Sequence, residues 1–96
     1  MSAVYKNYID GKWTAPFSGK YYRTYNPSDP DDCVGEFPLS EPEDVEQAVK
    51  AAHKAFLSWQ KVLPMERSVF VEKFASLLEE NVSSLGESLC REQGYR

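Results

Sequence analysis

Residues 40–59 constrain the fold most, because they carry both the start and the apolar face of an amphipathic helix. Ser40 and Glu43 have capping-box spacing, in which a hydroxyl accepts from a first-turn amide and a carboxylate accepts from the cap's own amide. Pro42 lies in the first turn, where its missing amide proton costs nothing. One stripe of the helix holds apolar residues at three- and four-residue steps: Val45, Ala48, Val49, Ala52, Phe56 and Trp59. We expect another segment to cover this stripe.

The chain before this helix has the pattern of short strands joined by turns. Asp10 and Gly11 separate two strand-like runs, and this pair supplies the positive φ angles that a two-residue hairpin turn requires. A further strand-like run follows, and residues 28–32, rich in Asp and Pro, indicate a loop. Gly35 marks a candidate bulge in one more short extended segment. The sequence therefore predicts a small, mostly antiparallel β meander.

Two more helices are expected after the first. Pro64 is placed to open the second helix and Asn81 to cap the third, which Gly94 would stop. Gly86 lies near the apolar edge of the third helix and suggests close contact with another helix. Arg67 projects onto the apolar side of the second helix. We expect its guanidinium to pair with a carboxylate or with carbonyls of a neighbouring segment, and ligand binding is the alternative.

Together these patterns predict an α+β chain with strands within about 5–39 and helices at about 41–60, 64–80 and 82–93. A chain of 96 residues can form one modest core and is too short for a two-domain enzyme with cofactor and substrate sites. The net charge of −4 argues against a nucleic-acid partner, because such affinity comes mostly from cations. No apolar run is long enough for a membrane span and no signal-peptide core is visible, so we expect a cytoplasmic protein.

Three side chains invite a catalytic interpretation. Cys33 follows Asp31 and Asp32, whose charges oppose a thiolate, and Cys90 has only an arginine beside it. Two cysteines so far apart define neither a disulfide framework nor a metal site. His53 lies on the flank of the first helix, with no residue in register to form a catalytic pair. We therefore expect no catalytic, cofactor-binding or metal-binding residue in this chain, and interpret these side chains as packing thiols and a surface histidine.

Short motifs run through nearly the whole chain, and each is weak by itself. They are residues 8–13 (YIDGKW), 18–20 (SGK), 25–27 (YNP), 43–45 (EDV), 51–52 and 55–56 (AA and AF) with Trp59, 66–67 (ER), 77–79 (LLE) and 92–94 (EQG). In this order and at these spacings they resemble the beginning of the NAD(P)-dependent aldehyde dehydrogenase superfamily. Residues 26–37 look like the semialdehyde-oxidising branches. Tyr95 departs from the pattern, because the family usually has lysine after the glycine.

The resemblance implies an enzyme several times longer than this chain. In the family a cysteine attacks the aldehyde, the hemithioacetal passes hydride to NAD or NADP, and a water activated by a glutamate releases the carboxylic acid. All of these parts lie beyond Arg96, and neither Cys33 nor Cys90 sits in the nucleophile motif. The family's beginning is a strand and helix layer of the Rossmann-like cofactor-binding domain. In some members the stretch that Tyr25 and Asn26 resemble binds a structural monovalent cation, with a further ligand from later in the chain.

Two hypotheses remain open. In the first, the chain is the N-terminal segment of an aldehyde dehydrogenase, inactive and without bound NAD or NADP by itself, and its partner is the remainder of the enzyme chain. In the second, it is a structural or interaction module that self-associates through helix faces such as that of Phe70, Phe74 and Leu78. Independent catalysis by Cys90 and His53 is a third possibility that lacks positioned partner groups.

Overall fold

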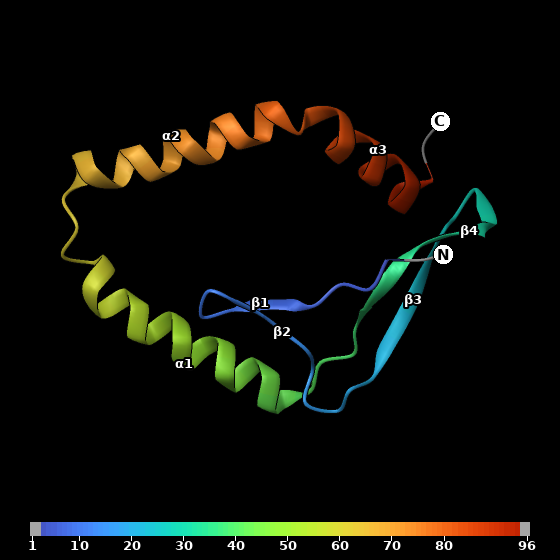
Figure 1. Ribbon diagram of the computed structural model, residues 1–96, viewed down its shortest axis with the longest axis horizontal. Helices are drawn as coiled ribbons and strands as arrows, with labels where there is room; N and C mark the ends of the chain where they lie inside the picture. The colour runs from blue at the N-terminus through green and yellow to red at the C-terminus, as the bar shows by residue number, and fades with distance from the viewer. Residues whose placement is uncertain (1–2, 95–96) are drawn as a thin grey trace.

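In the computed structural model, residues 3–94 are described as two β-hairpins followed by three helices. Four strands form the hairpins: β1 (Asn7–Ile9), β2 (Lys12–Thr14), β3 (Tyr21–Asn26) and β4 (Asp29–Pro38). Three helices follow, close to the ranges expected from the sequence: α1 (Pro42–Trp59), α2 (Pro64–Glu80) and α3 (Val82–Gln93). Figure 1 shows the hairpin β1–β2 between α1 and α2, with α3 close to β3 and β4. Tyr95 lies outside the described residues.

The first hairpin confirms the turn predicted at Asp10 and Gly11. Both residues have positive φ, 53° and 73°, which allows a two-residue connection between antiparallel strands. Tyr8 pairs with Trp13 across the strands, and their rings meet edge to face at 4.9 Å between centroids. The local sequence therefore specifies this hairpin by turn chemistry and by an aromatic cross-strand pair.

The second hairpin corrects the predicted meander. The strands form two separate two-stranded sheets, because the connection through Pro16 and Gly19, whose φ is 70°, redirects the chain between β2 and β3. The prediction of a loop at residues 28–32 is wrong from Asp29 onward, since β4 begins there and a tight turn suffices. β4 is longer than β3, and the residues of β4 that have no partner in β3 lie where the register of the strand pairing shifts.

The bulge lies beside Gly35, where the sequence placed a candidate. Thr24 pairs with Gly35 and Tyr25 pairs with Cys33, so Val34 is the extra residue. Gly35 is needed for a close approach, because a Cβ atom there would lie 2.6 Å from Cε2 of Tyr5. The stretch around Tyr5 is fixed to β4 by a backbone hydrogen bond from the amide of Tyr5 to the carbonyl of Glu36.

The start of α1 differs by one residue from the predicted capping box. Glu41 is the N-cap, and its amide donates to Oδ2 of Asp44 at 2.8 Å. Oδ1 of Asp44 accepts from the amide of Phe17 at 3.0 Å, and Asp44 is only 3% exposed. Ser40, the predicted cap, instead accepts from Nδ2 of Asn7. Asp44, rather than Glu43, therefore supplies the carboxylate of the capping box. Its carboxylate gains a second donor, the amide of Phe17, from a loop that is distant in sequence.

The connection between α2 and α3 differs in its caps. Asn81 is the N-cap residue of α3, as predicted, but its side chain makes no capping hydrogen bond to α3 and donates instead to the carbonyl of Leu77 in the last turn of α2. Gly94 ends α3 with a φ of 74°, as expected. The close contact predicted at Gly86 is wrong, because within residues 3–94 no other helix or strand comes within 4 Å of a Cβ placed there. Within residues 3–94, the half-exposed Arg67 side chain makes neither of the expected kinds of pair.

The apolar core of the described residues is very small. Its buried apolar side chains are Ile9, Val34 and Pro16, and Asp44 is the buried charged one. The stripe on α1 that we expected to be covered is mostly open: Val49 is 61% exposed, whereas Ala48 is half-buried and Trp59 packs on Phe70. None of the helices within residues 3–94 combines the length and the hydropathy needed to cross a membrane.

Candidate functional site

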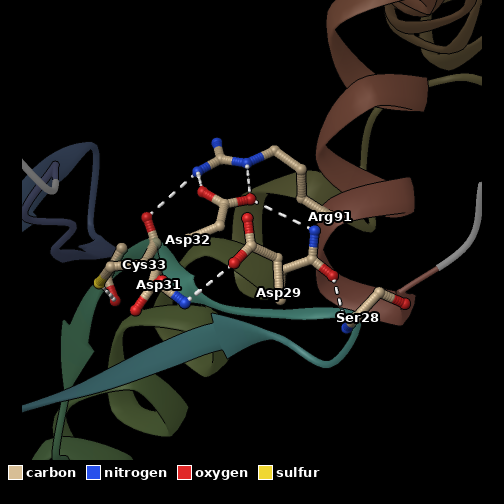
Figure 2. A network of polar contacts seen from close by, with 8 residues as sticks. Ser28, Asp29, Asp31, Asp32, Cys33 and Arg91 are labelled. Carbon is tan, nitrogen blue, oxygen red and sulfur yellow. Dashed lines mark hydrogen bonds and ion pairs between the residues drawn. The ribbon is translucent and has the colours of Figure 1, made fainter.

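The most connected polar site in the described structure joins the second hairpin to α3. We call it the hairpin–α3 junction and define it by Asn26, Ser28, Asp32, Arg91 and Gly94. Figure 2 shows the guanidinium of Arg91 reaching from α3 to the carboxylate of Asp32 at the start of β4. Nη2 of Arg91 donates to Oδ1 at 2.6 Å, and Nε donates to Oδ2 at 3.0 Å. This two-point pairing fixes the orientation of both side chains.

Other contacts of the junction use backbone groups. Nη2 of Arg91 also donates to the carbonyl oxygen of Cys33 at 3.1 Å. The hydroxyl of Ser28 donates to the carbonyl oxygen of Gly94 at 2.6 Å, and its amide donates to Oδ1 of Asn26 at 2.9 Å. Nδ2 of Asn26 donates to Asp32, which closes the network. The end of α3 is therefore held at two points.

The charges of the junction stabilise each other. Hydrogen bonding from Arg91 lowers the pKa of Asp32 below its ordinary value, and Asn26 adds to this effect while desolvation opposes it. The hydrogen bond to Asp32 in turn raises the pKa of Arg91. A carboxylate held in this way stays ionised near neutral pH, so it serves to orient α3 rather than to transfer protons.

A shallow hollow of about 320 Å³ lies beside the junction. It is lined by aromatic and polar side chains of β3, β4 and α3: Tyr22, Thr24, Tyr25, Phe37, Glu92 and Gln93. Oγ1 of Thr24 is buried there without a hydrogen-bond partner in the described structure. Within residues 3–94 no group of three or more His, Cys, Asp or Glu residues is arranged to hold a metal. The cation site suggested around Tyr25 and Asn26 stays a prediction.

The side chains considered for catalysis are not brought together among the described residues. His53 is exposed on α1, Cys90 is exposed on α3, and Cys33 is half-buried on β4. Within residues 3–94, the only hydrogen-bond partner of the Cys33 thiol is the carbonyl oxygen of Gly35, at 3.9 Å. Arg91, which could have favoured a thiolate at Cys90, is engaged by Asp32. The arrangement supplies no positioned nucleophile and base, and our assignment of no catalytic residue stays a prediction.

The start of α1 does not fit the phosphates of a dinucleotide. Such phosphates bind free amides at a helix N-terminus, usually after a glycine-rich turn. Here the amide of Glu41 is already bonded to the carboxylate of Asp44, so a phosphate would meet two acidic residues. The described residues therefore offer no cradle for NAD or NADP at this helix.

Sequence reasoning missed the hairpin–α3 junction. Asp32 and Arg91 are 59 residues apart, and the sequence pattern indicates Asp32 only as a loop residue and as a charge that opposes the Cys33 thiolate. The available signal was an acidic turn at 29–32 and a lone arginine in the last turn of the third helix. The opposite charges of Asp32 and Arg91 make an ion pair possible. Only the path of the backbone in the folded chain brings the two side chains together.

Comparison with known proteins gives a consistent result over nearly the whole chain. The model of the aldehyde dehydrogenase family matches residues 13–96. An alpha-ketoglutaric semialdehyde dehydrogenase of Bacillus subtilis is 37% identical over 91 residues, which are 95% of this chain and 19% of that protein. A malonate-semialdehyde dehydrogenase 2 of Bacillus anthracis is 38% identical over 91 residues, again 95% of this chain and 18% of that protein.

A third relative has a different substrate in its name. A long-chain-aldehyde dehydrogenase of Acinetobacter sp is 40% identical over 81 residues, covering 84% of this chain and 16% of that protein. The chain thus spans less than a fifth of the length of these relatives. Because the family model matches far more than half of the sequence, the chain belongs to the aldehyde dehydrogenase family.

Proposed function

We propose that this chain is the N-terminal part of an NAD(P)-dependent aldehyde dehydrogenase, an oxidoreductase that converts an aldehyde or semialdehyde to a carboxylic acid. The family match over residues 13–96 carries the proposal. Two of the compared relatives are named semialdehyde dehydrogenases, which favours a semialdehyde substrate. NAD or NADP supplies the hydride acceptor for such an oxidation.

The proposed role of this chain within the enzyme is structural. It forms a strand and helix layer on the Rossmann-like cofactor-binding domain, and its partner is the remainder of the enzyme chain. The apolar surfaces of α1 and α2 support this role, because Val49 and Phe74 are each more than 60% exposed in the described structure. The hairpin–α3 junction sets the direction in which α3 leaves the sheet. By itself the chain has no activity in this proposal.

A chimeric enzyme tests the proposal. The matching first fifth of the Bacillus subtilis relative is replaced by this chain, and aldehyde-dependent formation of NADH or NADPH is followed by absorbance. The chimera is expected to be active, while the relative without that segment and the 96-residue chain alone are expected to be inactive. The Arg91→Ala chimera is expected to lose activity or stability, and the Lys12→Ala chimera, changed at an exposed strand residue, to keep both.

Two results would contradict the proposal. A soluble chimera that forms no reduced cofactor with any aldehyde would show that the segment does not complete the enzyme. Aldehyde-dependent reduction of NAD or NADP by the 96-residue chain alone would place catalytic groups inside it.

A second candidate function is a structural module that associates with itself. The observation that favours it is the open apolar surface of the helices within residues 3–94, where no apolar side chain of a helix is buried. A chain of this kind would act through its assembly and not through chemistry. The chimera separates the candidates, because a pure association module would leave it inactive.

A further inference from the structure

Residues 3–6 lie along the outer edge of β4, and we call them the N-terminal strap. The amide of Glu36 donates to the carbonyl oxygen of Ala3, and the carbonyl oxygen of Glu36 accepts from the amide of Tyr5, both at 2.8 Å. Val4 is thereby paired with Glu36 in a parallel bridge. Because β3 pairs with the opposite edge of β4, these two backbone groups of Glu36 face outward. Outward-facing groups of this kind form hydrogen bonds with any extended segment that lies beside them.

One side chain of the strap has a defined place on this edge. The ring of Tyr5 stacks on the ring of Phe37, with 5.1 Å between centroids and 8° between planes. Gly35 makes room for the Tyr5 ring, because a Cβ atom there would lie 2.6 Å from Cε2 and 3.1 Å from Cδ2. Phe37 itself is supported by Tyr22 of β3, whose ring centroid lies 6.0 Å away. The edge therefore combines two backbone hydrogen bonds, which any residue can make, with a place for one flat ring.

The strap is held to the edge lightly. Its four residues are exposed, with Val4 at 52% and Tyr5 at 46%. The chain passes from the strap into β1, which has its own pairing with β2, so the strap can leave the edge while that hairpin stays closed. Residues 35–37 belong to β4 and stay paired with β3. Segments with few buried contacts open at the lowest free-energy cost, so we expect the strap to detach from a site that keeps its shape.

We propose that the outer edge of β4 at residues 35–37 is a docking site for an extended peptide segment that carries a tyrosine or a phenylalanine. The backbone of that segment takes the two hydrogen bonds of Glu36, and its ring takes the place over Gly35 against Phe37. The strap is the resident occupant of this site. It fits because it is extended, pairs in parallel and puts Tyr5 over Gly35.

The strap acts as an autoinhibitory contact at this site. It is joined covalently to β1, so its effective concentration at the edge is on the order of millimolar. A second segment reaches the edge only in the fraction of molecules whose strap is detached, and its apparent affinity falls by that fraction. The strap also closes an edge that otherwise pairs with unrelated chains. Loosening the strap is therefore expected to strengthen the binding of a segment added from outside.

A peptide with the sequence of residues 1–7, MSAVYKN, is the probe. It is titrated to millimolar concentration into the isotope-labelled 96-residue chain, and the amide signals of residues 35–37 are followed by nuclear magnetic resonance. We expect the peptide to shift these signals in the Tyr5→Ser chain, whose strap lacks the ring. Binding to the wild-type chain is expected to be weaker by about tenfold or more. Tyr25→Ser is the matched control, because Tyr25 is 47% exposed on β3, outside the strap, and this chain is expected to bind the peptide as weakly as the wild type.

Two further experiments test the ring and its place. The same peptide with Tyr5→Ser is expected to leave the signals unchanged. Gly35→Ala in the Tyr5→Ser chain removes the room for a ring, yet the strap of that chain has no ring to displace, so we expect it to fold and not to bind the tyrosine peptide. Equal binding by the two peptides, by the wild-type and Tyr5→Ser chains, or with and without Gly35→Ala would overturn the proposal, as would unshifted signals in the Tyr5→Ser chain. The proposal does not depend on the enzymatic assignment, so an inactive chimera leaves these tests unaffected.

Discussion

Asp32 shows how one residue can hold a helix to a hairpin. Its carboxylate receives two hydrogen bonds from Arg91, and Asn26 adds a third. The same guanidinium reaches the carbonyl of Cys33, so its donors are shared between side chain and backbone. A partly exposed ion pair of this kind contributes little to the free energy of unfolding, but it fixes the orientation of the two elements that it joins. The end of α3 is positioned by this residue pair.

The Asp32→Asn variant is expected to be less stable than the wild type at neutral pH. Because hydrogen bonding from Arg91 lowers the pKa of Asp32, folding favours the ionised carboxylate. This stabilisation is complete above the ordinary pKa of the carboxyl and is lost as the pH falls through the lowered folded-state pKa. Urea unfolding at a series of pH values measures the difference. Asp31→Asn, a neighbour with an exposed side chain, is the control. A difference that does not shrink in acid would contradict this account.

Two glycines should respond oppositely to the same substitution. Gly35→Ala places a methyl group 2.6 Å from Cε2 of Tyr5, whose ring is stacked on Phe37, and we expect a loss of about 1–3 kcal/mol. Gly86→Ala meets open space inside α3, and we expect a gain of up to about 1 kcal/mol from helix propensity. Denaturant unfolding of both variants measures the effects. Equal effects of one sign would show that the environment of Gly35 is not restrictive.

At the scale of elements, the helices follow from local sequence and the sheets do not. Helical ranges were predictable because apolar periodicity and the proline positions act within a few residues. The pairing of strands depends on residues far apart, and the meander predicted as one unit is two hairpins. The start of α1 depends on both local and distant residues. Its cap is local, but the choice of Asp44 over Glu43 depends on the amide of Phe17.

The Asp44→Ala variant tests that dependence. It removes the acceptor for the amides of Glu41 and Phe17, so we expect a loss of about 1–2 kcal/mol together with fraying of the first turn of α1. Glu43→Ala removes an exposed carboxylate one position earlier and is expected to have little effect. Amide hydrogen exchange at Phe17 and in the first turn of α1 measures both. Unchanged exchange at Phe17 would contradict this role.

At the scale of the whole molecule, the chain is an open arc of helices around small hairpins (Figure 1). The rings of Trp59 and Phe70 meet edge to face at 5.4 Å where α1 turns into α2. Beyond that corner the apolar side chains of α2 remain exposed, among them Phe70, Phe74 and Leu78. A buried core this small limits the stability of the chain alone. Association or a longer chain would add the missing burial.

Phe74→Ala is expected to have different effects in two contexts. In the 96-residue chain the side chain is 62% exposed, and its loss should change the free energy of unfolding by no more than about 0.5 kcal/mol. In an active chimera, where the proposed enzyme covers α2, the expected loss is about 3–5 kcal/mol. Glu72→Ala, at an exposed position of the same helix, is the control in both. Equal effects of Phe74→Ala in the two proteins would show that the enzyme leaves α2 uncovered.

The sequence by itself determined the features that depend on neighbouring residues. These are the Asp10-Gly11 turn, the ranges of the three helices, the stop at Gly94 and the family motifs. Hydrogen bonds and periodicity within a few residues fix such features, so they can be read without the fold.

Only the tertiary structure decided which distant groups meet. It paired Asp32 with Arg91, gave Asp44 the amide of Phe17, and left Val45, Val49 and Phe56 of the α1 stripe at least half exposed in the described chain. These outcomes depend on the path of the backbone, because a charge or an apolar side chain has many equivalent partners in the sequence. The direction of the chain between β2 and β3, together with the bulge beside Gly35, decides which of these possible partners lie close in space.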